Sequence, residues 1–347
     1  MHCSRFFFKC AGFVFLAVVA VCFFNFLLYP WSSLNRHFTE YREYDKNIDF
    51  LVIGDSLESN GMNAKVISQE FNENAFVLSP QGSYPESLYY ILLDVFKKHN
   101  LKTVVIGIDV LQNFENPPYV YPHPEELYRE FMQDMFKPLN PELIKLTVKN
   151  VMAQKYTSTF FKFASFPENI TEIPDVMKSK KELREHRELV KDKNYNSSVY
   201  WEKRNSVEPP VSERKFPKDF DEVVKQKYLD DMLDNDKKYI EQIYTFCMKN
   251  DIELYFMSNA VPRSVIDAVP ETLSFFDKTG EFIKNLKGGG MEEGTYINCT
   301  DQKYFPGSTD DYNFSDCYGH YNSWYRDTHT KQVCNYIKNL RKSRRQM

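Results

Sequence analysis

Short apolar runs alternate with amphipathic segments along much of this 347-residue chain, and this alternation is the feature that most restricts its fold. The runs at 50–53, 75–78 and 103–108 carry almost no charged side chain and are too short to be typical helices. Strands of this kind, separated by helices, are typical of a parallel sheet that is buried on both faces. The sequence therefore predicts an α/β fold, a three-layer sandwich around a parallel sheet.

Helices are predicted between and after these runs. The segment 85–100 has apolar side chains at helical spacing, which are Leu88, Ile91, Leu92 and Val95. Further helices are expected at about 63–71, 220–250, 272–286 and 323–340, and a fourth strand at 252–257. The stretch at about 115–220 contains several prolines and a densely charged run, which predicts an insertion or lid outside the βα core.

The N-terminal region contains an apolar run at 10–29 whose only strongly polar side chain is Asn25. Its length suits a hydrocarbon core of about 30 Å. The alternative is a cleaved signal peptide, whose apolar region would normally be only about 7–15 residues long. Arg5 and Lys9 precede the run and no acidic residue accompanies them, so the positive-inside rule places this end in the cytoplasm.

These features predict the organisation of the whole chain. Residues 1–9 are expected in the cytoplasm and 10–29 as a single-pass anchor in the cell membrane. A polar, aromatic-rich connector at 30–47 then leads to an extracytoplasmic α/β domain at 48–345, with the insertion at about 115–220.

Composition disfavours several classes of function. Lys and Arg total 44 and Asp and Glu total 48, a net charge of −4, whereas general nucleic-acid binders usually need a strongly basic surface. The mean hydropathy of −0.52 excludes a protein with many membrane spans. No G-x-G-x-x-G or G-x-x-x-x-G-K-[ST] phosphate loop occurs, which disfavours a nucleotide-binding α/β protein.

Four of the seven cysteines lie in the predicted outer domain, at Cys247, Cys299, Cys317 and Cys334. In an oxidising compartment they could form two disulfides, with three possible connectivities, or they could be ordinary buried thiols. No C-x-x-C pair is present, so a zinc ribbon or a thioredoxin-type site is not indicated.

The first strand is followed by the tetrapeptide Gly54-Asp55-Ser56-Leu57. In open α/β sheets, ligands bind outside the carboxyl ends of the strands. A serine at this position is close to helix N-terminal N–H groups, which stabilise a developing oxyanion. Ser56 is therefore a candidate nucleophile; the alternative is that its hydroxyl only caps the following helix.

A serine nucleophile needs a base, and His320 is the best placed of the seven histidines. It lies in a stretch rich in acidic, aromatic and turn-forming residues at 310–322, which has the character of an active-site loop. Asp316 could orient the imidazole as the acid of a triad does. The alternative for His320 is an ordinary histidine on a surface loop.

Together these residues resemble the SGNH (GDSL) hydrolase superfamily. The resemblance rests on the order strand–GDSL–helix, on an Asp/His pair before the last helix, and on the segments FLVIGDSLESNGMN, FVLSPQGSYPESLYYILLDVF and TVVIGIDV. It covers roughly 48–112 and 310–340 and is strongest to the membrane-anchored branch. That branch includes the lipoteichoic-acid D-alanylation protein and the alginate-type O-acetyltransferases. The fold that this resemblance implies is flavodoxin-like.

The resemblance also implies roles for individual residues. Ser56 matches the nucleophile, His320 the base and Asp316 the acid. Gly82, in Gln81-Gly82-Ser83, matches the glycine whose backbone N–H lines the oxyanion hole together with that of Ser56. The tripeptide His320-Tyr321-Asn322 fits the His-x-Asn pattern of the anchored branch, which favours His320 over His329 as the base.

The sequence departs from the superfamily pattern at two places. The third-block Gly-x-Asn-Asp is missing, because Gly107-Ile108-Asp109 stands near its place and supplies no Asn. The acid usually precedes the base by three residues, where this chain has Cys317, and Asp316 is displaced by one residue.

The resemblance implies a serine esterase or acyltransferase that acts on a cell-envelope polysaccharide or teichoic-acid-like polymer. It needs no metal and no organic cofactor, and the transferase version implies a membrane-bound acyl-donor protein as a partner. Aromatic side chains in the loops suit sugar stacking, namely Tyr84, Tyr312, Tyr318 and Trp324. The alternative is a non-catalytic subunit of the same fold that binds an envelope polymer or helps to assemble an acylation complex.

Overall fold

A computed structural model describes residues 9–17, 19–20, 33–80, 83, 85–108, 181, 234–286, 295–316 and 319–346. The chain divides into two compact units, one formed by Met1–Arg42 and Pro122–Lys191 and the other by Glu43–Tyr121 and Asp192–Met347. The second unit contains the sheet. Apart from Lys181, the insertion predicted at about 115–220 lies outside the described residues.

In the first unit, residues 9–17 and 19–20 are helical and exposed. Helix α2, at Ser33–Glu43, occupies most of the predicted connector, and its last residue is the first of the second unit. Within the described part of the chain, no helix is both long and apolar enough to span a membrane. Because residues 21–32 lie outside that part, the anchor at 10–29 stays a prediction.

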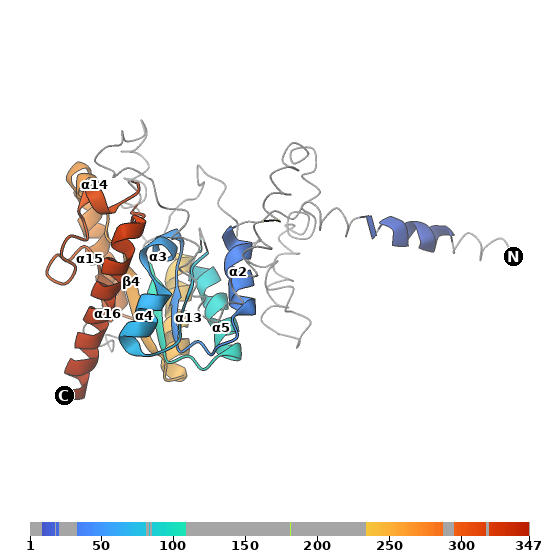
Figure 1. Cartoon of the computed structure of the whole chain (residues 1–347), viewed down its shortest axis with the longest axis horizontal. Coiled ribbons are helices and arrows are strands. Elements are labelled where there is room, and N and C mark those ends of the chain that lie inside the picture. The colour runs from blue at the N-terminus through green and yellow to red at the C-terminus, as the bar shows by residue number, and fades with distance from the viewer. Residues whose placement is uncertain are drawn as a thin grey trace. The chain divides into compact units, whose positions relative to one another are not determined.

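Five parallel strands form one sheet in the second unit, in the order β2-β1-β3-β4-β5. Figure 1 labels β4 and the helices around it. The strands are β1 at Phe50–Ile53, β2 at Ala75–Leu78, β3 at Thr103–Gly107, β4 at Glu253–Ser258 and β5 at Tyr296–Asn298. Every residue of β1, β2 and β3 is buried. The predicted α/β fold with a parallel sheet is confirmed.

Helices flank the sheet. They are α3 at Ser56–Gly61, α4 at Ala64–Phe71, α5 at Pro85–Lys98, α13 at Asp234–Lys249, α14 at Arg263–Ala268, α15 at Glu271–Lys284 and α16 at Ser323–Gln346. Helices α4 and α16 pack on each other, and so do α5 and α13, which also contact β1 and β4 respectively. Alternate strand residues face opposite sides of a sheet, and Phe50 and Val52 join one core cluster with Ile67 of α4 and Val333 of α16. This arrangement is consistent with a three-layer sandwich.

The strand order reverses at β1, because the chain passes from β1 to β2 on one side and then to β3 on the other. At such a switch point the connections after the two strands diverge and leave a crevice at their carboxyl ends. The turn after β1 carries Ser56, so the topology places this serine at the edge of the sheet where ligands bind.

The structure differs from the predicted elements at several places, one of which is helix α2 in the segment predicted as a connector. Strand β5 was not predicted, since it has only three residues and one fully buried apolar side chain, Ile297. Helix α14 was not predicted either. Helix α16 continues past its predicted end at residue 340, because Arg341 and Arg344 form ion pairs with Glu253 of β4.

Candidate functional site

The turn between β1 and α3 is held by a reciprocal cap. The carboxylate of Asp55 accepts a hydrogen bond from the backbone N–H of Leu57 at 2.7 Å, and Glu58 Oε2 accepts one from the backbone N–H of Asp55 at 2.8 Å. This capping box satisfies donors at the start of the helix. Asp55, and not Ser56, is therefore the cap, which leaves the serine hydroxyl to other contacts.

Ser56, His320 and Asp316 form one chain of hydrogen-bond contacts, although 264 residues separate the serine from the histidine. Ser56 Oγ lies 2.7 Å from His320 Nε2, and His320 Nδ1 lies 2.5 Å from Asp316 Oδ2. The second carboxylate oxygen of Asp316 accepts the backbone N–H of His320 at 3.2 Å. The side chains of His320 and Asp316 are 24% and 29% exposed, so solvent reaches them.

The loop before α16 accommodates the displaced acid. Gly319 has φ of +101°, a conformation that favours glycine, and it turns the backbone immediately before His320. Ser315 N–H donates to the carbonyl of His320 at 2.8 Å, and the amide of Asn322 donates to the carbonyl of Phe314 at 2.8 Å. A carboxylate four residues before the base therefore reaches its ring.

His329 does not join this chain of contacts. Its side chain is fully buried, burial lowers its pKa to about 3, and its Nε2 lies 3.1 Å from Asn259 Oδ1. His99 is also occupied elsewhere, because its Nδ1 accepts the backbone N–H of Ile48 at 3.3 Å. Within the described residues, the histidine that contacts Ser56 is His320.

The predicted oxyanion hole is only partly described. Gly82 lies outside the described residues, and so does Asp109 of the degenerate third block. Next to Gly82, the hydroxyl of Ser83 donates to the carbonyl of Pro80 at 2.8 Å. Gly82 as an oxyanion donor therefore stays a prediction. Among the described residues, no group of His, Cys, Asp or Glu side chains is arranged to hold a metal ion.

The described cysteines of the second unit are buried. Cys247 and Cys334 are free thiols, and burial raises the pKa of each to about 12. Cys299 is buried as well, and Cys317 lies outside the described residues. For Cys247 and Cys334, the structure supports the alternative of ordinary buried thiols.

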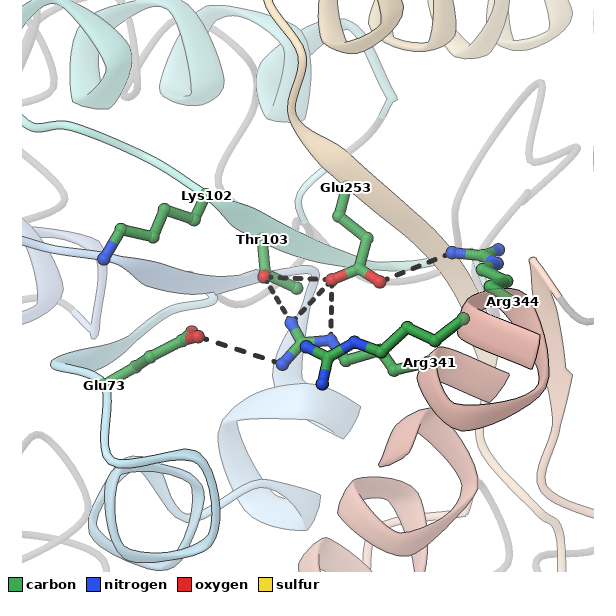
Figure 2. A pocket seen from close by; sticks show the side chains of 7 residues that line it. Glu73, Lys102, Thr103, Glu253, Arg341 and Arg344 are labelled. Carbon is green, nitrogen blue, oxygen red and sulfur yellow. Dashed lines mark hydrogen bonds and ion pairs between the residues drawn. The ribbon is translucent and has the colours of Figure 1, made fainter. Parts of the chain in front are cut away.

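A second polar cluster lies at the amino ends of β3 and β4 (Figure 2). It surrounds a hollow of about 370 Å³ lined by Glu73, Lys102, Thr103, Glu253, Arg341, Arg344 and Arg345. Arg341 Nε and Arg344 Nη1 donate to Glu253 at 2.8 and 3.3 Å, and Arg341 Nη2 also donates to Thr103 at 2.7 Å. Because carboxylates engage these guanidinium groups, the cluster fastens α16 to the sheet, at the edge opposite to Ser56.

Sequence reasoning missed two polar residues next to the site. Glu58, on α3, and Asn259, directly after β4, are both buried, and Asn259 Nδ2 donates to Glu58 Oε1 at 2.6 Å. The available signal was the spacing Asp55-x-x-Glu58, which is typical of a capping box at the start of a helix. Nothing in the local sequence marks Asn259 as its partner.

No protein-family model matches the chain, and no curated protein matches it.

Proposed function

We propose that this chain is a serine esterase or O-acyltransferase of the SGNH type. The observation that supports this proposal is the run of contacts from Ser56 Oγ to His320 Nε2, at 2.7 Å, and from His320 Nδ1 to Asp316, at 2.5 Å. Acyl transfer by a serine requires a base within hydrogen-bond reach of the hydroxyl and a third group that orients the base. The site also lies at the carboxyl edge of a parallel sheet, the usual position for a ligand.

In the proposed reaction, Ser56 Oγ attacks the carbonyl carbon of an ester while His320 Nε2 takes the hydroxyl proton. Asp316 stabilises the resulting imidazolium, which then gives the proton to the leaving alcohol. The acyl group, now bound to Ser56, passes either to water or to the hydroxyl of a sugar or polyol. Backbone N–H groups of Ser56 and Gly82 bind the oxyanion, as the resemblance to the superfamily implies.

The proposed substrate is an acylated polysaccharide or teichoic-acid-like polymer of the cell envelope. Two exposed aromatic residues in the segments before and after the base support it, because Tyr312 and Trp324 are 63% and 42% exposed and their ring centroids lie 5.3 Å apart. Aromatic faces of this kind suit the apolar faces of sugar rings. The anchor at 10–29, an insertion or lid at about 115–220 and a membrane-bound acyl-donor protein complete the proposal.

The test compares Ser56→Ala with Ser59→Ala, a control on the same short helix whose hydroxyl is buried. Purified protein is assayed for hydrolysis of p-nitrophenyl acetate and for release of acetate from an O-acetylated polysaccharide. Ser56→Ala is expected to lower turnover by at least about 10³-fold, whereas Ser59→Ala keeps it. Equal turnover by wild type and Ser56→Ala would refute the proposed nucleophile.

The missing third-block Asn favours a second candidate, a non-catalytic subunit that binds an envelope polymer or an acylation complex. This candidate predicts that wild type and Ser56→Ala bind the polymer with the same affinity and that neither turns over an ester. Turnover by wild type that Ser56→Ala abolishes would exclude it.

A further inference from the structure

A chain of three buried polar side chains lies beneath the turn that carries Ser56. Glu58, Asn259 and His329 are 0%, 1% and 0% exposed. Asn259 Nδ2 donates to Glu58 Oε1 at 2.6 Å, and His329 Nε2 lies 3.1 Å from Asn259 Oδ1. The three residues belong to α3, to the segment after β4 and to α16, so this chain, called here the buried relay, crosses the carboxyl edge of the sheet.

Two glycines make room for the carboxylate of Glu58. Gly54 follows β1 and Gly107 ends β3, and a Cβ atom on either one would overlap the Glu58 side chain. Neither glycine has a positive φ, so space and not backbone conformation requires them. Gly107 stands near the position of the missing third block, and its lack of a side chain leaves room for the carboxylate of Glu58.

The hydrogen bonds of the buried relay have a defined direction. Glu58 accepts at both oxygens, from the backbone N–H of Asp55 and from Asn259 Nδ2. Asn259 then presents its carbonyl oxygen to His329, whose imidazole is neutral because burial lowers its pKa to about 3. The single ring proton is therefore on Nε2. Nδ1 of His329 is buried and has no hydrogen-bond partner within the described residues.

We propose that Glu58 is a positioning residue for Ser56 and that the buried relay couples the nucleophile turn to α16. Glu58 holds the backbone of Asp55, directly before the serine. At the other end, His329 is part of α16, which begins at Ser323, shortly after the base His320. Both partners of the 2.7 Å contact between Ser56 and His320 are thus tied to one chain of buried hydrogen bonds. Such networks fix geometry that apolar packing alone leaves looser.

The proposal rests on the proposed function, since positioning matters only if Ser56 reacts, but its structural part has an independent test. Glu58→Gln has the same shape and replaces one acceptor with a donor. The carbonyl oxygen of the new glutamine must face the N–H of Asp55, so its NH₂ group faces Asn259. Asn259 can accept a hydrogen bond from this NH₂ only if its own side-chain amide rotates by half a turn. Asn259 would then present NH₂ to His329, and the imidazole would move its proton from Nε2 to Nδ1.

This change of tautomer is visible in the ¹⁵N chemical shifts of His329 in histidine-labelled protein. Wild type is expected to show the proton on Nε2, and Glu58→Gln to show it on Nδ1. The control is Glu70→Gln, which removes a surface carboxylate that pairs with Lys338 and should leave the wild-type tautomer. An Nε2 proton that persists in Glu58→Gln would overturn the coupling.

The functional part is tested by the rate at which a fluorophosphonate labels Ser56. Glu58→Gln is expected to lower the maximal labelling rate by about tenfold to 100-fold, with little change in the half-saturating concentration, whereas Glu70→Gln labels as wild type. An unchanged rate in Glu58→Gln would overturn the positioning role. Absence of labelling in wild type would instead overturn the proposed function, and the tautomer measurement would still decide whether the buried relay exists.

A second pair of variants is informative if Glu58→Gln fails to fold. His329→Gln can still donate an N–H to Asn259 and is expected to keep most of the labelling rate. His329→Leu leaves the carbonyl oxygen of Asn259 without that donor and is expected to label several-fold more slowly. Equal labelling rates in the two variants would overturn the proposal.

Discussion

Replacing Asp316 with Asn tests whether the displaced acid completes the site. In wild type, one oxygen of Asp316 contacts His320 Nδ1 at 2.5 Å and the other accepts the backbone N–H of His320 at 3.2 Å. An Asn that keeps the backbone contact turns its NH₂ toward the ring. Nδ1 must then be unprotonated, the ring proton moves to Nε2, and His320 can no longer accept the proton of Ser56.

The expected loss follows from this geometry. A wrong tautomer in a buried serine triad lowers kcat by about 10⁴-fold. Here the His320 and Asp316 side chains are 24% and 29% exposed. Water can therefore hydrogen-bond to the His320 ring, which makes the loss of kcat smaller than in a buried triad. We expect kcat/KM for p-nitrophenyl acetate to fall roughly 10²- to 10³-fold, which is about 3–4 kcal/mol of transition-state stabilisation.

The matched control is Asp310→Asn, in the same loop, because the side chain of Asp310 makes no capping hydrogen bond and the residue is exposed. This variant should retain wild-type kcat/KM. Thermal unfolding of both variants shows whether the loop is intact. If Asp316→Asn stays within about twofold of wild type while His320→Ala is inactive, the acid plays no part and the reasoning about the displaced residue is refuted.

Three further predictions concern stability and reactivity. Arg341→Met should lower the free energy of unfolding in urea at pH 7 by about 2 kcal/mol. Burial raises the pKa of Glu253, but the hydrogen bonds from Arg341 and Tyr255 and the charges of Arg341 and Arg344 together outweigh burial, and the net shift is downward from 4.5. The stability difference should therefore shrink as pH falls from about 4.5 through the lowered pKa, and a difference that stays constant over this range would contradict the reasoning. Burial lowers the pKa of His329 from 6.5 to about 3, so between these pH values the imidazole is protonated in the unfolded chain but not in the folded one. Wild-type stability should therefore fall as pH drops from 6.5 toward 3, and urea titrations of His329→Gln should show a shallower fall; equal slopes would argue against a buried neutral imidazole. Cys247, whose pKa burial raises to about 12, should resist iodoacetamide at pH 8 until urea is added, as measured by mass spectrometry, and rapid alkylation of the native protein would contradict its burial.

The sheet was predictable where the sequence carries continuous apolar runs. Strands β1 to β4 follow from such runs, because strands covered on both faces need apolar side chains at every position. Strand β5 escaped prediction because three residues with one fully buried side chain, Ile297, make no recognisable pattern. The C-terminal end of α16 was not predicted either, because the ion pairs of Arg341 and Arg344 with Glu253 join residues that are far apart in the sequence.

The site was predictable only in part. Ser56 stands out because it follows the first strand, and His320 because its loop is rich in acids and turn formers. The structure brings these two side chains and Asp316 into contact, and their chemical roles stay predictions. The backbone turn at Gly319 that lets Asp316 reach the ring depends on a φ value that no sequence pattern states.

The buried relay was not predictable from periodicity. Polar residues are ordinarily assigned to surfaces, and Glu58, Asn259 and His329 meet only because α3, β4 and α16 come together in the folded chain. The fold has to be known before their complementary donors and acceptors can be matched.

The central claim is that Ser56 is a nucleophile activated by His320, and covalent labelling tests it most directly. Protein treated with a fluorophosphonate is analysed by intact mass and then by peptide mapping. We predict a single adduct on Ser56 in wild type, none in Ser56→Ala, and labelling at least about 10²-fold slower in His320→Ala. No adduct on wild type, or an adduct that forms equally fast in His320→Ala, would contradict the account.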